Sequence, residues 1–143
     1  MASRIDHVSA ADGTDLLTRH WPADEATAGG AWAGQPWASV LLVHGLGEHS
    51  GRYEHVGDQL AAAGIETYAY DHRGNGASGG RRGHIDRWGQ YHDDLGERLA
   101  AVRAAAAGQP VARYGHSMRG LIVAGYCLGD RPKPDLVGLG APG

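Results

Sequence analysis

The chain has 143 residues, which is enough for one ordinary domain with a single core. Hydrophobic residues make up 42% and charged residues 20% of the sequence, as is usual for a globular protein in water, and the net charge is −3. Because the sequence has no block of basic residues, its composition argues against nucleic-acid binding.

The N-terminal residues M-A-S-R-I-D-H-V do not combine a basic stretch with an apolar one, so they do not predict a signal peptide. No apolar run approaches the roughly 18 residues of a membrane-spanning helix. The single cysteine, Cys127, excludes an internal disulfide and lies in the apolar stretch L-I-V-A-G-Y-C-L, which favours a buried, unreactive thiol. We therefore expect a cytoplasmic protein without a transmembrane segment.

The first half of the chain predicts a strand pair and then a strand–helix unit. Residues 4–22 predict two short strands around an Asp-Gly turn, and the Ala- and Gly-rich residues 23–36 predict a surface loop. The apolar run S-V-L-L-V at 39–43 is typical of a strand buried on both faces. A glycine-containing turn follows this strand, and residues 53–63 then fit a helix that ends at Gly64.

The second half of the chain repeats the alternation of strand and helix. We expect a strand over 65–70, a glycine- and arginine-rich loop over 72–84, and the longest helix over 86–107. The remaining elements are a strand over 111–114, a helix over 121–128 and a strand over 135–139. This order predicts an α/β fold with a mostly parallel sheet and helices on both faces.

Ser117 is the candidate nucleophile, in the sequence G-H-S-M-R-G between a predicted strand and a predicted helix. A strained strand-to-helix turn of this kind exposes a serine hydroxyl above the sheet. Arg119 stands where such a turn has glycine, and its long side chain would strain the contact between helix and strand by ~1–3 kcal/mol. A complete G-x-S-x-G match occurs around Ser78, but no strand enters it and no helix leaves it, so we interpret it as a loop.

The turn His44-Gly45-Leu46-Gly47 follows the predicted buried strand. In a hydrolase it could offer a backbone N–H to an oxyanion, with the N–H of Met118 as the second donor.

A dinucleotide-binding module is the alternative interpretation of the same turn. Gly45, Gly47 and Ser50 approach the spacing of the dinucleotide glycine fingerprint. Asp71 ends the next strand at the sequence distance of a ribose contact.

The other polar clusters favour structural roles. His44, His49 and His55 are close in sequence, but no H-E-x-x-H motif accompanies them, so we expect no metal site. Asp93 and Asp94 are expected on the solvated face of the long helix rather than as an acid–base pair. The arginines of the long loop could bind an anion, but salt bridges within the loop are the simpler interpretation; they are Arg73, Arg81 and Arg82.

Three linked motifs resemble a known family. They are H-G-L-G-E-H-S-G-R-Y from residue 44, D-H-R-G-N-G-A-S-G-G-R-R-G-H-I from residue 71 and G-H-S-M-R-G from residue 115. In this order and spacing they resemble the monoacylglycerol lipase and lysophospholipase branch of the α/β-hydrolases, from about Val40 to the C-terminus. The resemblance implies an α/β-hydrolase fold and hydrolysis of carboxylic esters of single-chain acyl lipids through an acyl-serine, without a cofactor.

The resemblance also implies individual roles. Ser117 corresponds to the nucleophile, and the backbone N–H groups of Leu46 and Met118 correspond to the oxyanion hole. His44 and Gly45 belong to the turn that supports this hole.

The triad of this fold runs Ser, then acid, then His along the chain. After Ser117 the acidic residues are Asp130 and Asp135, which both come too early, and no histidine follows His116. We therefore expect residues 1–143 to form the N-terminal part of one hydrolase domain, without the lid and the last strands, and to be inactive alone. In the alternative, the chain is half of a split hydrolase that a complementing C-terminal fragment completes.

Overall fold

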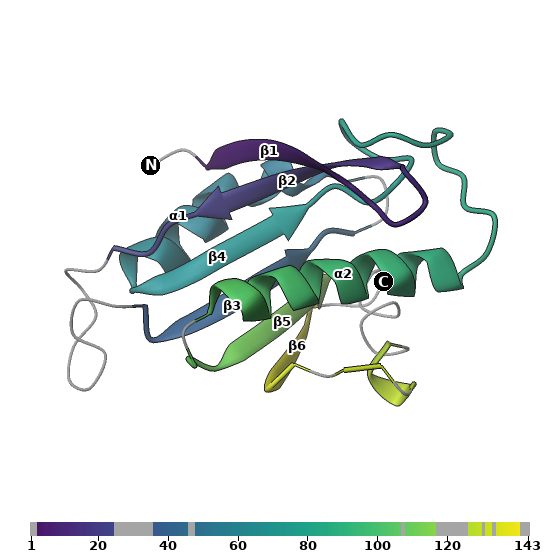
Figure 1. Cartoon of the computed structure of the whole chain (residues 1–143). Coiled ribbons are helices and arrows are strands. Elements are labelled where there is room, and N and C mark those ends of the chain that lie inside the picture. Colours follow the sequence, from purple (N-terminus) through teal and green to yellow (C-terminus); the bar gives the residue numbers. More distant parts are fainter. Residues whose placement is uncertain are drawn as a thin grey trace.

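The computed structural model describes residues 3–24, 36–45, 48–106, 108–116, 126–129, 131–132 and 134–140. Within these residues, six strands form one sheet in the order β1-β2-β4-β3-β5-β6 (Figure 1). The strands are β1 (Arg4–Ser9), β2 (Asp15–Trp21), β3 (Ala38–Val43), β4 (Ile65–Tyr70), β5 (Val111–His116) and β6 (Leu136–Gly140). The helices are the short 3-10 helix η3 (Ser50–Tyr53), α1 (Glu54–Ala62) and α2 (Gly89–Ala105).

The sheet is antiparallel at one side and parallel at the other. β2 runs antiparallel to both β1 and β4, whereas β4, β3, β5 and β6 are parallel to one another. Parallel neighbours need crossover connections, and α1 and α2 lie in two of these connections. The predicted fold class, an α/β fold with a mostly parallel sheet and an N-terminal antiparallel pair, is confirmed.

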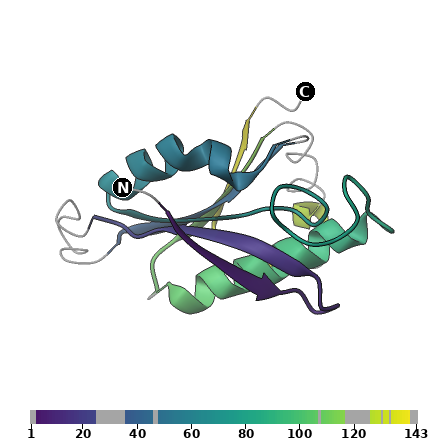
Figure 2. The same cartoon turned by 90° about the horizontal axis from the view of Figure 1, so that it is seen from above.

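Helices cover both faces of the sheet (Figure 2). Leu41 and Val43 of β3 pack in the core cluster that contains the apolar residues of α2, whereas Leu42 packs in the cluster that lies against α1. Successive side chains of a strand point to opposite faces, so a strand that is covered on both sides needs an uninterrupted apolar run. The run at 39–43 has this property.

The contact between α1 and β2 depends on Gly57. A Cβ atom at this position would lie 2.3 Å from the ring of the buried Trp21, so no larger residue fits without a shift. The indole Nε1 of Trp21 also donates a hydrogen bond to Glu54 Oε2 at 3.0 Å. These contacts fix the helix on its face of the sheet.

α2 buries one stripe of its surface. Tyr91, Leu95, Leu99 and Val102 are buried and recur at intervals of three or four residues, as expected for a helix that packs with one face on a sheet. Asp94 is also among the buried residues of this helix.

The predicted boundaries differ from the structure by two residues or more at two elements and by one residue at several others. The long helix begins at Gly89 rather than at residue 86, because the side-chain oxygen of Gln90 accepts the N–H of Asp86 and holds that segment in a turn. β5 extends to His116, two residues beyond the prediction, because Gly115 and His116 pair with β6. Most of the predicted helix over 121–128 and the loop over 25–35 lie outside the described residues.

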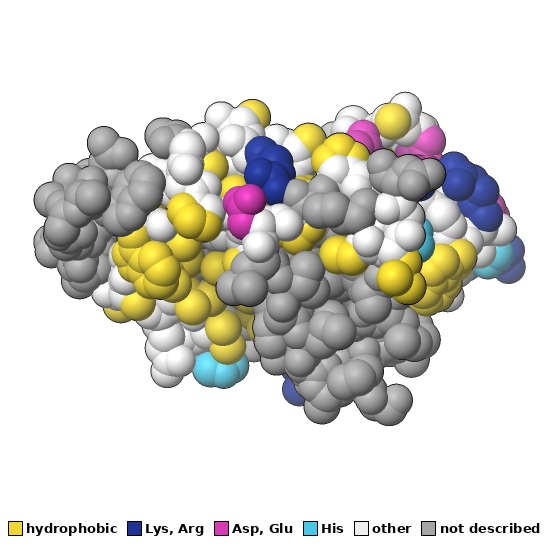
Figure 3. All heavy atoms as spheres, turned by 90° about the horizontal axis from the view of Figure 1, so that it is seen from below, with side chains coloured by type: hydrophobic (Ala, Val, Ile, Leu, Met, Phe, Trp, Pro, Cys, Tyr) yellow, Lys and Arg dark blue, Asp and Glu magenta, His cyan; other side chains and the backbone are white. Residues whose placement is uncertain are grey.

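The described surface exposes a few large apolar side chains. In the view of Figure 3, hydrophobic side chains form several separate groups with few charged side chains between them. No helix in the described part of the chain is both long enough and apolar enough to cross a membrane. The exposed large apolar residues are Ile5, Trp37, Trp88 and Leu128.

Candidate active site

Three neighbouring parallel strands end at the same edge of the sheet. The register pairs Val43 of β3 with Tyr70 of β4 and with Gly115 of β5. The turn that begins at His44 and the loop that begins at Asp71 therefore leave the sheet side by side, and β5 ends at His116, directly before Ser117 in the sequence. Open α/β sheets place their ligand sites at this carboxyl edge.

Several predicted site residues lie outside the described part of the chain. These are Leu46, Gly47, Ser117, Met118 and Arg119. The assignments of the nucleophile and of the two oxyanion donors therefore stay predictions, whereas His44, Gly45 and the surrounding turns can be analysed.

His44 joins the ends of β3 and β4. Its imidazole is buried, and Nε2 accepts the backbone N–H of His72 at 2.9 Å. Because that nitrogen is an acceptor, the proton of a neutral ring is on Nδ1, which donates to the carbonyl oxygen of Gly45 at 2.8 Å. Both ring nitrogens are thus engaged, so in this arrangement His44 supports the turn and cannot act as a general base or metal ligand.

Glu48 closes the turn that contains the predicted oxyanion donor. Its Oε2 accepts the N–H of Gly45 at 2.6 Å and the hydroxyl of Tyr53 at 2.9 Å. The backbone N–H of Glu48 donates to the carbonyl oxygen of Gly45 at 3.2 Å. The N–H of Gly45 is therefore occupied by Glu48 and is not free to bind an oxyanion.

Asp71 joins the turn after β3 to the loop after β4. Its Oδ1 accepts both the N–H and the hydroxyl of Ser50, at 2.7 and 2.6 Å, and its Oδ2 accepts the N–H of Ala77 at 2.9 Å. Burial raises the pKa of Asp71, but these hydrogen bonds outweigh it and lower the pKa below the ordinary value. Gly76 fits beside the carboxylate because it has no Cβ, which would lie 2.3 Å from Oδ2.

The alternative role of Asp71 as a ribose ligand is wrong. The residue is 1% exposed, and both of its carboxylate oxygens already accept hydrogen bonds from the chain. A ribose hydroxyl would have to displace these bonds, so the dinucleotide-binding interpretation of Gly45, Gly47 and Asp71 is withdrawn.

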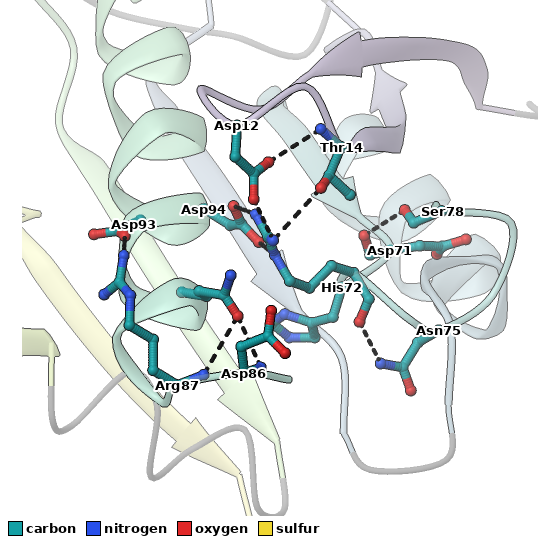
Figure 4. Close-up of polar contacts among 12 residues, drawn as sticks. Asp12, Thr14, Asp71, His72, Asn75, Ser78, Asp86, Arg87, Asp93 and Asp94 are labelled. Carbon is teal, nitrogen blue, oxygen red and sulfur yellow. Dashed lines mark hydrogen bonds and ion pairs between the residues drawn. The ribbon is translucent and has the colours of Figure 1, made fainter. Parts of the chain in front are cut away.

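Ser78 has a structural role. Its buried hydroxyl donates to the carbonyl oxygen of Asp71 at 2.6 Å, and its Oγ accepts the N–H of Leu17 at 2.9 Å. Figure 4 shows Ser78 beside Asp71 within the loop. The interpretation of this G-x-S-x-G match as a loop is confirmed.

Arg73 connects three elements through carboxylates. Its Nε and Nη2 donate to the two oxygens of Asp94 at 2.7 and 2.8 Å, and its Nη1 donates to Asp12 at 2.7 Å. Figure 4 shows Asp12 and Asp94 converging from the β1–β2 turn and from α2. The hydrogen bonding of Arg73 to the carboxylate of Asp94 is the largest cause that raises the pKa of Arg73. Arg73 thus forms salt bridges, as predicted, but its partners lie outside the loop. Arg82 instead donates to the backbone carbonyl oxygen of Gly76 at 2.8 Å.

The prediction that Asp94 lies on a solvated helix face is wrong. Asp94 is 0% exposed because it follows Tyr91 by three residues and so lies on the buried stripe of α2, whereas the side chain of Asp93 is 39% exposed. Asp93 instead pairs with Arg87 at 2.8 Å and with Arg131 at 2.7 Å.

The position of Asp135 excludes it as a triad acid. Its Oδ2 accepts the N–H of Val111, the first residue of β5, at 2.8 Å. Ser117 follows the last residue of β5, and the intervening strand spans roughly 20 Å at ~3.3 Å per residue. Asp130 lies outside the described residues.

No group of three metal-binding side chains occurs among the residues that the structure describes. Of the predicted histidines, His44 is engaged as above, and His49 accepts the N–H of Gly51 at 3.2 Å through its Nδ1.

Sequence reasoning missed the roles of Glu48 and Asp94. Glu48 follows Gly45 by three residues, which is the spacing at which a carboxylate reaches back to a backbone N–H in a capping box. Asp94 was detectable from the helical period of its apolar neighbours.

Residues 34–142 match the family described as serine aminopeptidase, S33. The chain is 41% identical over 91 residues to monoacylglycerol lipase from Mycolicibacterium smegmatis, covering 64% of this chain and 32% of that protein. It is 33% identical over 118 residues to human monoglyceride lipase, covering 82% of this chain and 36% of that protein. The chain thus spans about a third of the length of these relatives.

Solved structures agree with the fold. A soluble variant of monoglyceride lipase from Saccharomyces cerevisiae, in complex with a substrate analog, superposes with a TM-score of 0.75 at 28% identity, over 91% of this chain and 41% of that one. A carboxyl esterase from Bacillus coagulans superposes with a TM-score of 0.78 at 23% identity, over 97% of this chain and 44% of that one. This similarity supports the fold alone. With a family match over most of its residues and the sheet order described above, the chain belongs to the serine aminopeptidase S33 family of α/β-hydrolases.

Proposed function

We propose that this chain provides the nucleophile and the oxyanion hole of a serine hydrolase that cleaves carboxylic esters of single-chain acyl lipids, with monoacylglycerols as the leading substrate class. The convergence of three motifs at the ends of β3, β4 and β5 carries this proposal. The names of the relatives, which are monoacylglycerol and monoglyceride lipases, support the substrate class.

In the proposed reaction, the hydroxyl oxygen of Ser117 attacks the ester carbonyl and passes its proton to a histidine base. The N–H groups of Leu46 and Met118 stabilise the negative charge that develops on the carbonyl oxygen. The tetrahedral intermediate then expels the glycerol alkoxide, which takes the proton from the histidine and leaves an acyl-serine. Water, activated by the same histidine, releases the fatty acid and regenerates the serine.

The described residues would hold the oxyanion turn in place. Glu48 fixes Gly45 from both sides, and His44 anchors the same residue to the end of β4. Asp71 fixes Ser50, at the far end of the turn, to the next loop. A donor that is rigid before the reaction costs no reorganisation when charge develops, which is the basis of oxyanion stabilisation.

The base and the acid of the triad are not supplied by the described candidates. The two nitrogens of His44 are engaged, and Asp135 lies at the opposite edge of the sheet. A polypeptide made only of residues 1–143 should therefore turn over esters slowly, and the base and acid would come from a further segment or from a second chain.

A chimera tests this proposal. Residues 1–143 are joined to the corresponding C-terminal remainder of the M. smegmatis relative, and release of fatty acid from a monoacylglycerol is measured. We expect turnover that Ser117→Ala abolishes and that the exposed-site control Ser9→Ala leaves unchanged. Residues 1–143 alone should be slower by at least about 10³-fold, since a site without its triad partners keeps only residual catalysis.

Two further arms separate the alternatives. Adding the same remainder as a separate polypeptide tests whether the chain can work as half of a split hydrolase. Arg119→Gly in the chimera should raise turnover if Arg119 strains the elbow. A folded Arg119→Gly chimera without any Ser117-dependent hydrolysis would contradict the proposed function.

A further inference from the structure

A hollow of about 340 Å³ lies away from the candidate active site, between the β1–β2 pair and the C-terminal half of α2. In Figure 1, α2 crosses the lower part of the sheet face and leaves β2 and part of β4 uncovered above it. The pairs Arg4–His20 and His20–Tyr68 bring those three side chains to one face, and Tyr68 packs against the core cluster of α2. The hollow therefore opens on the α2 face of the sheet.

Two arginines without ion-pair partners line this hollow. The Nε of Arg98 is buried and has no hydrogen-bond partner, and neither Arg98 nor Arg4 pairs with a carboxylate among the described residues. A buried donor that gives up water without gaining a protein partner costs about 1–3 kcal/mol, and more when it is charged. This arrangement differs from that of Arg73, whose guanidinium is held by two carboxylates.

The nearby carboxylates do not compensate these arginines. Glu66 accepts hydrogen bonds from His20 Nε2 at 2.5 Å and from the N–H of Ala23 at 2.8 Å. Asp6 also lines the hollow, and its carboxylate accepts the N–H of His7 at 2.8 Å. Asp6 contributes one negative charge to the lining, whereas Arg4 and Arg98 contribute two positive charges, so these three side chains leave a net positive charge.

The remaining lining suits an anion with a short apolar part. Burial and the neighbouring Glu66 carboxylate raise the pKa of Tyr68 to about 12, so its hydroxyl keeps its proton and can donate. Leu41 and Val102 supply apolar wall. A volume near 340 Å³ is at the lower end of the range for small-molecule sites.

We propose that this hollow, called here the α2 groove, binds a small organic anion whose carboxylate or phosphate group lies against the guanidinium groups of Arg98 and Arg4. Tyr68 donates a further hydrogen bond, and the short apolar part of the ligand lies against Leu41 and Val102. Charge-assisted hydrogen bonds from guanidinium groups are among the strongest available to such anions. The proposal is independent of hydrolysis at Ser117, because the described lining comes from β1–β4 and α2.

Titration of the full chain, labelled with ¹⁵N at arginine, tests the α2 groove. The arginine Nε–H resonances are followed while butyrate, methyl phosphate or sodium chloride is added in separate arms. We expect saturable shifts of the Arg98 resonance with butyrate or methyl phosphate and none with chloride. Tighter binding of butyrate would identify a carboxylate with an apolar tail as the preferred class, and tighter binding of methyl phosphate would identify a phosphate.

Variants assign the effect to the groove. Arg98→Gln should weaken binding about tenfold or more, which corresponds to at least ~1.4 kcal/mol. Arg103→Gln, on the same helix but paired with Asp135 at 3.7 Å, should leave binding unchanged. Arg4→Gln, at an exposed strand position, should weaken binding without affecting the fold and decides the matter if Arg98→Gln does not fold. Absence of a saturable shift in the unaltered chain, or equal binding by the Arg4, Arg98 and Arg103 variants, would overturn the proposal.

Discussion

Removing one partner of the ion pair between Arg73 and Asp94 should strongly destabilise the domain. Asp94 is fully buried, and Arg73 is more than nine-tenths buried and donates two hydrogen bonds to it. In Asp94→Ala the guanidinium keeps Asp12, whose side chain is 46% exposed, and a long hydrogen bond to Thr14 Oγ1 at 3.5 Å. Removing one partner of a buried pair costs about 3–5 kcal/mol, and because Asp12 remains we expect a loss near ~3 kcal/mol.

Urea unfolding, followed by tryptophan fluorescence and by far-ultraviolet circular dichroism, measures this loss. The matched control is Asp93→Ala on the adjacent residue, whose ion pairs with Arg87 and Arg131 are solvent-exposed. Exposed pairs contribute about 0–1 kcal/mol, so the control should unfold almost as the unaltered chain does. A lower midpoint at an unchanged slope would show that stability, and not the compactness of either state, has changed.

A double variant separates the cost of the unpaired charge from the loss of the contact. Arg73→Met with Asp94→Leu removes both charges and keeps apolar volume in the site, so it should be more stable than Asp94→Ala. The reasoning is refuted if Asp94→Ala stays within about 1 kcal/mol of the unaltered chain. It is also refuted if the double variant is no more stable than Asp94→Ala.

Three further changes test other contacts. The pKa of Asp71 is lowered in the folded chain, so this residue stabilises the fold above its unfolded pKa, near 4. The contribution is lost as pH falls through the folded pKa. Between about pH 6 and 3 the urea midpoint should therefore fall more steeply for the unaltered chain than for Asp71→Asn. Gly57→Ala should destabilise the domain by about 1–3 kcal/mol, because the new Cβ overlaps with Trp21. Gly96→Ala, whose Cβ would lie 3.3 Å from Tyr126 Oη, should destabilise it less. A lower melting temperature for Gly96→Ala than for Gly57→Ala would contradict the packing argument. In the chimera, Glu48→Ala should lower kcat about tenfold or more with little change in KM. Glu48→Gln keeps an acceptor oxygen and should recover part of the lost kcat. An unchanged kcat in Glu48→Ala would show that the turn does not depend on this carboxylate.

Sequence patterns predicted the elements with a strong period and the class of fold. β4 lies exactly over the predicted residues 65–70, because its run of β-branched, apolar and aromatic residues is bounded by Gly64 and Asp71. The end of β5 was not predictable from local sequence, since Gly115 and His116 are extended by pairing with β6, which lies 24 residues further along the chain. Long-range pairing of this kind has no local signal.

The candidate site was predicted as a set of motifs but not as a set of contacts. The order of the motifs located the carboxyl edge, because parallel strands that follow one another through helices end together. The partners of Asp71 could not be derived, since Ser50 and Ala77 reach it from two irregular turns whose shapes depend on the bonds themselves. The helical spacing of Asp94 from Tyr91 predicts that it is buried, but its charge led to the wrong expectation of a solvent-exposed position.

The polar residues of the motifs satisfy backbone groups where the strands end. A chain that leaves a sheet has N–H and C=O groups without ladder partners, and when these are buried they must be paired by other means. His44, Asp71 and Ser78 accept or donate such bonds at the ends of β3 and β4. Side chains that resemble catalytic groups in the sequence are therefore used for structure, and the proposed chemistry falls to Ser117 and to backbone N–H groups.

This division separates two kinds of variant. Asp71→Asn replaces an acceptor oxygen by a donor where Ser50 and Ala77 both donate, so it should reduce stability and turnover of the chimera together. Ser117→Ala removes only the nucleophile and should reduce turnover with little effect on the urea midpoint. If Asp71→Asn lowered turnover at full stability, its carboxylate would act in the reaction itself, and the structural role assigned to it here would be wrong.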